Sequence, residues 1–262
     1  MSNKSLSGKT AFITGAAHRI GARTAQELHA QGANIILHYR NSKTAAEALQ
    51  NELNSQRPDS VRLLKGDLLD TTTLDSLIEQ AVQQYGHLVV LINNASSFYP
   101  TAVGEVTNKE WDDLIGTNMK APFFLSQAAA TALGQQQGCI INIVDIHAER
   151  PLKGYPVYSM AKAGLVMMTK ALACELGPDV RVNAIAPGAI LWPENDMDAA
   201  TQEKIISRTF LKRKGDPGDI ARTALFLIKD ATYMSGQIPV SYTHLTLPTT
   251  IELCRCRWSP DH

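Results

Sequence analysis

The feature that most constrains the fold of this chain is a regular alternation of short apolar runs with longer amphipathic segments. The apolar runs are rich in β-branched residues and predict buried strands, whereas the segments between them have the spacing of helices. Because each return to a parallel strand needs a crossover, this order predicts a doubly wound α/β fold, with one parallel sheet and helices on both faces. The expected strands lie near residues 10–14, 34–39, 61–65, 88–92, 139–144, 180–185 and 237–240, and the expected helices near residues 20–31, 43–55, 72–85, 108–133, 157–176 and 217–228.

Length, charge and cysteine usage exclude several classes of protein. The chain has 262 residues without an obvious linker, so we expect one domain over residues 1–240. Its 25 Lys and Arg residues balance 25 Asp and Glu residues, which leaves no long-range field for collecting nucleic acid. No apolar run approaches the roughly 20 residues that span a bilayer. The N-terminal MSNKSLSGK lacks the apolar core of a secretory signal, and the four cysteines show no metal or disulfide spacing. These features predict a cytoplasmic protein that uses no metal, membrane or nucleic acid.

The C-terminal segment breaks the alternating pattern. Residues 241–262 read SYTHLTLPTTIELCRCRWSPDH, without clean periodicity, and they contain two of the four cysteines. We interpret the segment either as a peripheral extension or as a misread or fused gene end.

A glycine-containing turn follows the first expected strand. Residues Thr14–Gly21 read TGAAHRIG, and a helical pattern comes next. Such a turn lets backbone N–H groups approach a pyrophosphate at a helix N-terminus, which makes the expected fold Rossmann-like. Arg19 stands where a third glycine would be expected. Its guanidinium either reaches the pyrophosphate or an anionic or carbonyl-bearing substrate, or it is a surface group on the first helical turn.

The residues after the second expected strand indicate which cofactor binds. They read LHYRNSK, with Arg40 and Ser42 and no acidic residue. Enzymes that use NAD commonly place an acid here for the ribose hydroxyls, whereas an arginine suits the 2′-phosphate of NADP. We therefore expect NADPH as the cofactor, and the alternative is a solvated turn.

Tyr158 and Lys162 form a candidate catalytic pair, in the string YSMAK at the start of a helix. A step of four residues places both side chains on one helix face. A neighbouring ammonium favours the tyrosinate, so we expect the pKa of the Tyr158 phenol to be lowered. Tyr158 would then donate protons near neutral pH.

Taken with NNAS after the fourth strand, these motifs resemble the short-chain dehydrogenase/reductase family. The resemblance covers about Lys9 to Val240. It rests on Thr14–Gly21, Asn93–Ala95, the Tyr158/Lys162 pair and Pro187–Gly188. It implies that Asn118 helps to hold a water and proton relay to the lysine, and that Asp67 contacts the adenine amino group. It also implies that Lys162 holds the nicotinamide ribose.

The chain departs from the family pattern at one catalytic position. Family members usually carry a serine about a dozen residues before the tyrosine, and Asp145 stands there in this chain. A serine hydroxyl can donate a hydrogen bond to a carbonyl oxygen, whereas an ionised carboxylate repels that oxygen. A carboxylate suits a ring nitrogen that must gain a proton, directly or through a polarised tyrosine. The alternative is an aspartate that only caps a turn, with catalysis lost.

The arginine-bearing turn, Asp145 and the string NNASSFYPT together resemble pteridine reductases, a branch of this family. The resemblance implies that Phe98 stacks on a pterin ring, which lies between it and the nicotinamide. The alternative for Phe98 is packing of a loop. The resemblance also implies that Ser96 contacts cofactor phosphate or pterin amino groups, that Tyr155 flanks the substrate, and that residues 188–197 form a mobile substrate loop.

The sequence thus predicts NADPH-dependent reduction of biopterin-like pterins or folate to the tetrahydro form, by a homotetramer. One rival is a carbonyl reductase of the same family, acting on 3-oxoacyl or sugar substrates, and a rival of another class is a non-catalytic NADPH sensor. The expected catalytic residues are Asp145, Tyr158, Lys162 and Asn118, and the expected substrate-binding residues are Arg19, Ser96, Phe98, Asp145, Tyr155 and Tyr158. The residues expected to bind the cofactor are Gly15, His18, Arg19, Ile20, Tyr39, Arg40, Asn41, Ser42, Asp67, Leu68, Asn94, Ala95, Ser96, Tyr158, Lys162, Pro187, Gly188 and Ile190.

Overall fold

The computed structural model describes residues 6–188, 190, 203, 206–207 and 209–241. The chain divides into two compact units, the first made of residues 1–191 and 215–242, the second of residues 192–214 and 243–262. All strands and helices named below belong to the first unit. Most of the expected substrate loop at residues 188–197, and the C-terminal segment after Ser241, lie outside the described residues.

One sheet of seven parallel strands forms the centre of the first unit, as the alternating pattern predicts. The strand order is β3-β2-β1-β4-β5-β6-β7. In register, Ile13 of β1 is level with Leu37 of β2 on one side and Ile92 of β4 on the other. The strands are β1 (Thr10–Ile13), β2 (Asn34–Tyr39), β3 (Val61–Lys65), β4 (Val90–Asn93), β5 (Cys139–Ile143), β6 (Arg181–Pro187) and β7 (Val240–Ser241).

The last strand is shorter than its sequence pattern indicates and begins further along the chain. A strand was expected near residues 237–240, and the structure has β7 at Val240–Ser241. The backbone still follows β6 over the earlier residues, because Gln237 and Pro239 carbonyls accept from Ala184 and Ala186 N–H. Proline has no N–H to donate to a ladder, so regular pairing begins only after Pro239.

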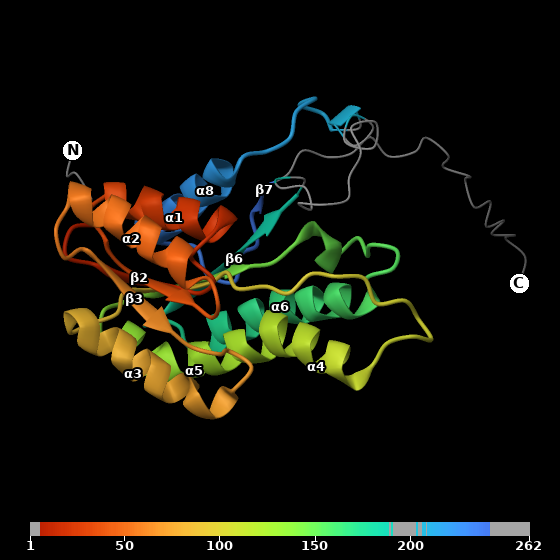
Figure 1. Cartoon of the computed structure of the whole chain (residues 1–262), viewed down its shortest axis with the longest axis horizontal. Helices are drawn as coiled ribbons and strands as arrows, with labels where there is room; N and C mark the ends of the chain where they lie inside the picture. Colours follow the sequence, from red (N-terminus) through yellow and green to blue (C-terminus); the bar gives the residue numbers. More distant parts are fainter. Residues whose placement is uncertain (1–5, 189, 191–202, 204–205, 208, 242–262) are drawn as a thin grey trace, which may run out of the picture. The chain divides into compact units, whose positions relative to one another are not determined.

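Helices cover both faces of the sheet (Figure 1). On one face lie α1 (Arg19–Ala30), α2 (Lys43–Gln56) and α8 (Pro217–Lys229), and on the other α3 (Leu74–Tyr85), α4 (Asn108–Ile115), α5 (Ala121–Gly134) and α6 (Pro156–Glu175). Short 3-10 turns at Thr71–Thr73 (η1) and Ile146–Ala148 (η3) complete the chain path of this unit. Their arrangement is the two-sided cover that buries a parallel sheet.

The segment expected as one helix at residues 108–133 is interrupted. The structure has α4, then a π-helical turn η2 at Gly116–Lys120, then α5. A π turn inserts one residue into the hydrogen-bond ladder without ending the helix, and such turns occur frequently at functional sites.

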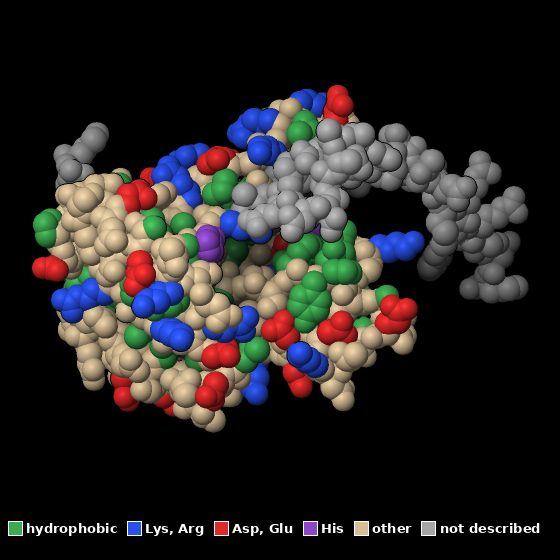
Figure 2. Space-filling model, in the orientation of Figure 1, with side chains coloured by type: hydrophobic (Ala, Val, Ile, Leu, Met, Phe, Trp, Pro, Cys, Tyr) green, Lys and Arg blue, Asp and Glu red, His purple; other side chains and the backbone are tan. Residues whose placement is uncertain are grey.

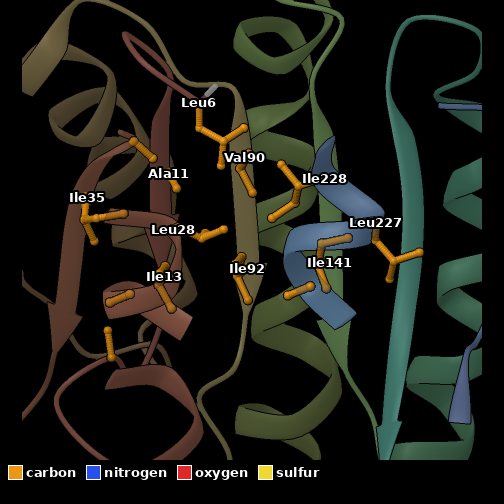
Figure 3. Close-up of a cluster of buried hydrophobic side chains, with 14 of the residues drawn as sticks. Leu6, Ala11, Ile13, Leu28, Ile35, Val90, Ile92, Ile141, Leu227 and Ile228 are labelled. Atoms are coloured by element: carbon orange, nitrogen blue, oxygen red, sulfur yellow. The ribbon is translucent and has the colours of Figure 1, made fainter. Parts of the chain in front are cut away.

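The hydrophobic core occupies both sides of the sheet. On the side of α1 and α8, the strand residues Ile13, Ile35, Ile92 and Ile141 pack against Leu28 and Leu227 (Figure 3). The strands are buried on both faces, so β1 and β5 contain no exposed residue. This packing fixes the strand ends, where the loops with polar side chains emerge.

No helix in the described ranges is long and apolar enough to cross a membrane.

Candidate active site

The expected site residues gather at the carboxyl ends of β1, β4 and β5. The chain order reverses between β1 and β4, because β2 lies on one side of β1 and β4 on the other. In open parallel sheets this reversal leaves a crevice outside the carboxyl ends of the strands, where ligands bind. Figure 2 shows a hollow on the face it presents, with hydrophobic side chains beside it.

Close backbone packing builds the glycine turn after β1. Gly15 has φ +59°, a left-handed conformation that favours glycine, and a Cβ there would lie 2.9 Å from the Ala95 Cα. The Asn94 side chain donates to the carbonyl oxygens of Thr14 at 2.9 Å and Gly15 at 3.0 Å. Asn94 therefore holds the turn against the end of β4, and glycine at position 15 lets the turn lie against Ala95.

Arg19 takes the left-handed conformation of a glycine. Its φ is +54°, in agreement with the expectation of glycine at this position from the turn pattern. His18 is the N-cap residue, and its side chain makes no capping bond, while Ile20 packs partly against the core. The first residue of α1 is thus an arginine, next to the N–H groups that attract an anion.

Arg40 and Asp67 lie together at the ends of β2 and β3. Their charged groups are 3.7 Å apart and about half-exposed, so the pair adds little to folding stability. Asp67 also accepts from the Leu69 N–H at 3.1 Å. Of the other residues expected here, Tyr39 and Leu68 are buried, whereas Asn41 and Ser42 lie in the turn that leads into α2.

His38 is a residue that the sequence analysis missed. Its Nδ1 lies 3.3 Å from the Gly15 N–H, and its Nε2 lies 3.2 Å from the Gly66 carbonyl. The first contact needs an acceptor and the second a donor, so the ring is neutral with its proton on Nε2. Burial lowers the pKa of His38 to about 4. The sequence sign of this buried link between Gly15 and Gly66 was a histidine within the apolar run NIILHY.

Asp145 and Tyr158 are hydrogen-bonded. The Tyr158 hydroxyl donates to Asp145 Oδ2 at 2.8 Å, and the other carboxylate oxygen accepts from the His147 N–H at 2.8 Å. The aspartate therefore caps the η3 turn and contacts the tyrosine at the same time. Tyr158 lies in the first turns of α6, which begins at Pro156, a favoured residue at that position.

Lys162 lies one helical turn after Tyr158 and is buried. Its Nζ donates to the Ile143 carbonyl at 2.9 Å, and lies 5.7 Å from the centre of the Tyr158 ring. Burial lowers the pKa of Lys162 to about 8, against the opposing effect of the Asp145 charge. The ammonium is held at the end of β5 by that strand's own carbonyl.

The pKa of Tyr158 moves in the direction opposite to the expected one. Burial of the phenol raises it well above its ordinary value, and the charge of Asp145 and its hydrogen bond raise it further. The expectation rested on the charge of Lys162 alone, without desolvation or the carboxylate. The expectation of a lowered pKa was therefore wrong.

Asn118 is fully buried in the π turn η2. Its amide nitrogen donates to the carbonyls of Leu114 and Ser97, both at 2.9 Å. Its amide oxygen accepts from the Ser96 hydroxyl at 2.6 Å. The expected water and proton relay stays a prediction, while the direct partners of the side chain are Ser96 and two carbonyls.

Phe98 presents an aromatic face beside the tyrosine. Its ring stacks on Tyr155, with centroids 4.7 Å apart and planes 14° apart, and meets the Tyr158 ring edge-on at 4.8 Å. Phe98 is 44% exposed, which is high for a ring that only packs a loop. The structure thus brings Phe98, Tyr155 and Tyr158 together.

Directly after β6, the structure describes Gly188 and Ile190. The Gly188 N–H donates to the Ser241 carbonyl at 3.3 Å, and the Ile190 N–H donates to the Gly188 carbonyl at 2.8 Å. Ile190 is buried in the core beside α8, so its side chain serves packing. The cofactor contact expected for Pro187, Gly188 and the backbone of Ile190 stays a prediction.

These residues fit a dinucleotide. A Cβ on Gly15 or Gly21 would clash with Ala95 or Asn94, so glycine lets the turn lie close to the segment after β4, and Arg40 supplies a partly exposed cation at the adenosine end. Lys162 and Tyr158 lie at the other end of the crevice, where a nicotinamide and a proton donor would meet. Within the described ranges, no group of three or more His, Cys, Asp or Glu residues could hold a metal.

The fold and this site define an oxidoreductase of the dinucleotide-binding class. A family model described as Enoyl-(Acyl carrier protein) reductase matches residues 15–241. The chain belongs to the short-chain dehydrogenase/reductase family of NAD(P)-dependent oxidoreductases, as the motifs predict.

Relatives of two activities match at similar identity. A 3-oxoacyl-[acyl-carrier-protein] reductase of Staphylococcus aureus is 34% identical over 233 residues, which cover 87% of this chain and 94% of that protein. Pteridine reductase 1 of Leishmania tarentolae is 33% identical over 267 residues, which cover 86% and 92%. Among solved structures, a blue fluorescent protein from a metagenomic library, in complex with NADPH, has a TM-score of 0.86 at 33% identity, covering 93% of this chain and all of that one.

Proposed function

We propose that this chain is an NADPH-dependent pteridine reductase. The observation that carries the proposal is the Asp145 carboxylate, 2.8 Å from the Tyr158 hydroxyl. A carboxylate at the proton donor favours a substrate whose ring nitrogen gains a proton, and disfavours a carbonyl oxygen that gains negative charge. The exposed Phe98 ring beside Tyr158 offers a stacking surface for a planar heteroaromatic substrate.

The cofactor preference rests on the adenosine end of the crevice. Arg40 stands after β2 with no acid in the same turn, and Asp67 holds its guanidinium from the side. An arginine here suits the 2′-phosphate of NADP. The NADPH complex of the metagenomic protein supports the same choice. When bound, the cofactor would supply the hydride, and the proposed role of Lys162 is to hold its nicotinamide ribose.

Protein groups supply orientation and a proton. Phe98 and Arg19 position the ring, and Tyr158 delivers the proton that it shares with Asp145 in their hydrogen bond. Because burial and the carboxylate both raise the pKa of Tyr158, the phenol stays protonated until a substrate accepts its proton.

A 3-oxoacyl reductase is the second candidate. The relatives favour it, because several 3-oxoacyl-[acyl-carrier-protein] reductases match the chain at slightly higher identity than the pteridine reductase does. The hydrogen-bonded Tyr158 and the buried Lys162 suit either activity. They argue against the non-catalytic NADPH sensor, because such a protein would not need an intact Tyr158/Lys162 pair.

A cytoplasmic homotetramer is part of the proposal. Three apolar side chains on α5 and α6, Phe123, Met160 and Met167, are exposed in the single chain. Contacts between copies would remove such side chains from water.

The proposal is tested by following NADPH absorbance with a dihydropterin, an oxidised pterin, dihydrofolate and an acetoacetyl thioester. We expect turnover of pterins and a loss of about 10- to 100-fold for Phe98→Ala, because stacking supplies roughly 1–3 kcal/mol. Tyr233→Ala removes a fully exposed aromatic ring outside the site and serves as the control. Turnover of the thioester alone would select the second candidate, and NADPH binding without any turnover would select the sensor.

A further inference from the structure

A buried hydrogen bond joins β5 to the second half of α6. The Asn142 amide nitrogen donates to the Thr169 hydroxyl at 2.9 Å, and both residues are fully buried. The Thr169 hydroxyl donates its own hydrogen to the Leu165 carbonyl at 2.8 Å, so it is the acceptor in the bond from Asn142. The Asn142 amide oxygen therefore faces the other way, where it accepts from the Asn93 amide on β4 at 2.8 Å. Asn142 is thus held on both sides.

Thr169 lies on the same face of α6 as the candidate catalytic pair. Lys162 comes about one helical turn after Tyr158, and Thr169 comes about three turns after it. At these three positions α6 forms hydrogen bonds with β5 or with the residues directly after it. A helix is stiff along its axis, so a shift of α6 at Thr169 moves the Tyr158 hydroxyl as well.

The contacts of Tyr158 and Lys162 are made by groups that the proposed reaction uses. Tyr158 gives up the proton that it donates to its carboxylate partner, and Lys162 must share its ammonium between the Ile143 carbonyl and the nicotinamide ribose. The bond from Asn142 to Thr169 includes no reacting group, so it persists through turnover. It also fixes the helix more sharply than apolar packing does, because hydrogen bonds depend on distance and angle and the hydrophobic effect has no direction.

We propose that Asn142 is a positioning residue for proton transfer, which through Thr169 fixes the position of α6 along β5. The Tyr158 hydroxyl thereby keeps its place beside Asp145 and the substrate. The inference rests on the proposed role of Tyr158 as proton donor and does not depend on which substrate is reduced. Displacement of a reacting group by about 1 Å can lower a rate by roughly 10²-fold, so a small movement of α6 is enough to change kcat.

The kinetic test compares two variants of Thr169 that differ in the hydroxyl. Thr169→Val keeps the shape of the side chain and removes the acceptor for Asn142, whereas Thr169→Ser keeps the acceptor and removes a buried methyl group. Both should lower Tm by roughly 2–8 °C. With NADPH and the pterin or thioester that the parent reduces fastest, Thr169→Val should lower kcat by roughly 5- to 50-fold, and Thr169→Ser should stay within about 2-fold of the parent.

Two further variants complete the comparison. Asn142→Ala breaks the same bond from the strand side and should lower kcat as Thr169→Val does. Thr223→Val on α8 is the matched control, because the Thr223 hydroxyl also donates to a carbonyl four residues earlier, that of Asp219, at 2.8 Å. This control should keep the kcat of the parent. Equal losses of kcat in Thr169→Val and Thr169→Ser would overturn the role of Asn142, because the rate would then follow packing and not the hydrogen bond.

A second measurement needs no turnover. A tyrosine with one ring fluorine, placed at position 158, is observed by ¹⁹F NMR, because its chemical shift responds to the hydrogen bond with Asp145. Thr169→Val and Asn142→Ala should shift and broaden this signal. Thr169→Ser and Thr223→Val should leave it in place. An unmoved signal in both Thr169→Val and Asn142→Ala would overturn the proposal even if kcat decreased.

The Tyr158→Phe variant separates this inference from the proposed function. Full activity in Tyr158→Phe would reject the tyrosine as proton donor, and this inference with it. Turnover of the thioester alone would reject the pteridine reductase, and the Thr169 variants would then decide this inference with the thioester as substrate. An inactive Tyr158→Phe beside an unchanged kcat in Thr169→Val would reject the role of Asn142 alone.

Discussion

At the scale of single residues, Asp145 is the residue on which the proposed preference for a pterin over a 3-oxoacyl substrate depends. One oxygen of its carboxylate caps the η3 turn and the other accepts from Tyr158, so its position is fixed from both sides. The sequence leaves turn capping and catalysis as alternatives for Asp145, and in the structure its carboxylate both caps the turn and contacts Tyr158. An oxygen held in this way cannot turn aside when a carbonyl substrate approaches.

Asp145→Ser should change the substrate preference. Loss of the carboxylate removes the second and third causes of the raised pKa of Tyr158, and a hydroxyl can donate to a carbonyl oxygen. We expect pterin turnover to fall by about 10²- to 10⁴-fold and turnover of the acetoacetyl thioester to increase. The ratio of kcat/KM for the two substrates measures the change.

Asp113→Ser is the control for this prediction. Asp113 also accepts from a tyrosine, Tyr99, at 2.9 Å, and this pair lies outside the path of the proton. Asp113→Ser should leave the ratio of the two substrates unchanged. Equal ratios in Asp145→Ser and the parent would show that Asp145 does not determine the substrate.

At the scale of elements, the strands and most helix starts could be predicted, because buried parallel strands appear as continuous apolar runs. The π turn at Gly116–Lys120 could not, since α5 after it is apolar on nearly all sides and has no narrow stripe in which the shift caused by one inserted residue would show. Asn118 was placed by resemblance, and its partners Ser96, Ser97 and Leu114 required the structure. Local pattern does not determine which carbonyls an amide meets across the fold.

The π turn packs closely against α6 through Met119. A Cβ on Gly164 would clash with the Met119 sulfur. Gly164→Ala should therefore displace Met119, and with it the neighbouring Asn118. We expect a loss of about 1–3 kcal/mol in the free energy of unfolding, measured with urea, and a lower kcat.

Gly134→Ala is the matched control, because its Cβ would meet Asp179 at 3.6 Å, an ordinary contact. Alanine is the better helix former, so this variant should be neutral or more stable by about 0.5–1 kcal/mol. Adding Met119→Ala to Gly164→Ala should recover part of the loss. No recovery in the double variant would mean that the strain does not lie at this contact.

At the scale of the whole molecule, the single parallel sheet with helices on both faces agrees with the sequence expectation, and the pKa of Tyr158 differs from it. The raised pKa of Tyr158 and the lowered pKa of Lys162 both have burial as their largest cause. Burial is a property of the packed molecule, since α6 must lie on the sheet before either group leaves water. Sequence spacing could place Lys162 beside Tyr158 but could not weigh their charges against desolvation.

His38 links the packing of the molecule to pH. It connects the glycine turn at Gly15 with Gly66 after β3, and burial lowers its pKa from 6.5 to about 4. The unfolded chain protonates His38 near its ordinary pKa, whereas the folded protein does so only near pH 4. Between these values the unfolded state binds more protons, so the free energy of unfolding decreases as the pH falls through this window. The decrease should reach about 3 kcal/mol at its lower end.

His38→Asn tests this linkage, because asparagine does not titrate. Urea unfolding between about pH 7 and pH 4.5 should show a steep loss of stability in the parent and a shallower one in the variant. The free energy of unfolding of the variant should still decrease somewhat as the pH falls, since burial also lowers the pKa of His29. The variant should bind NADPH more weakly at every pH, because the Gly15 N–H loses the ring nitrogen that orients it. Parallel stability curves for the two proteins would show that neutral His38 does not govern the acid response.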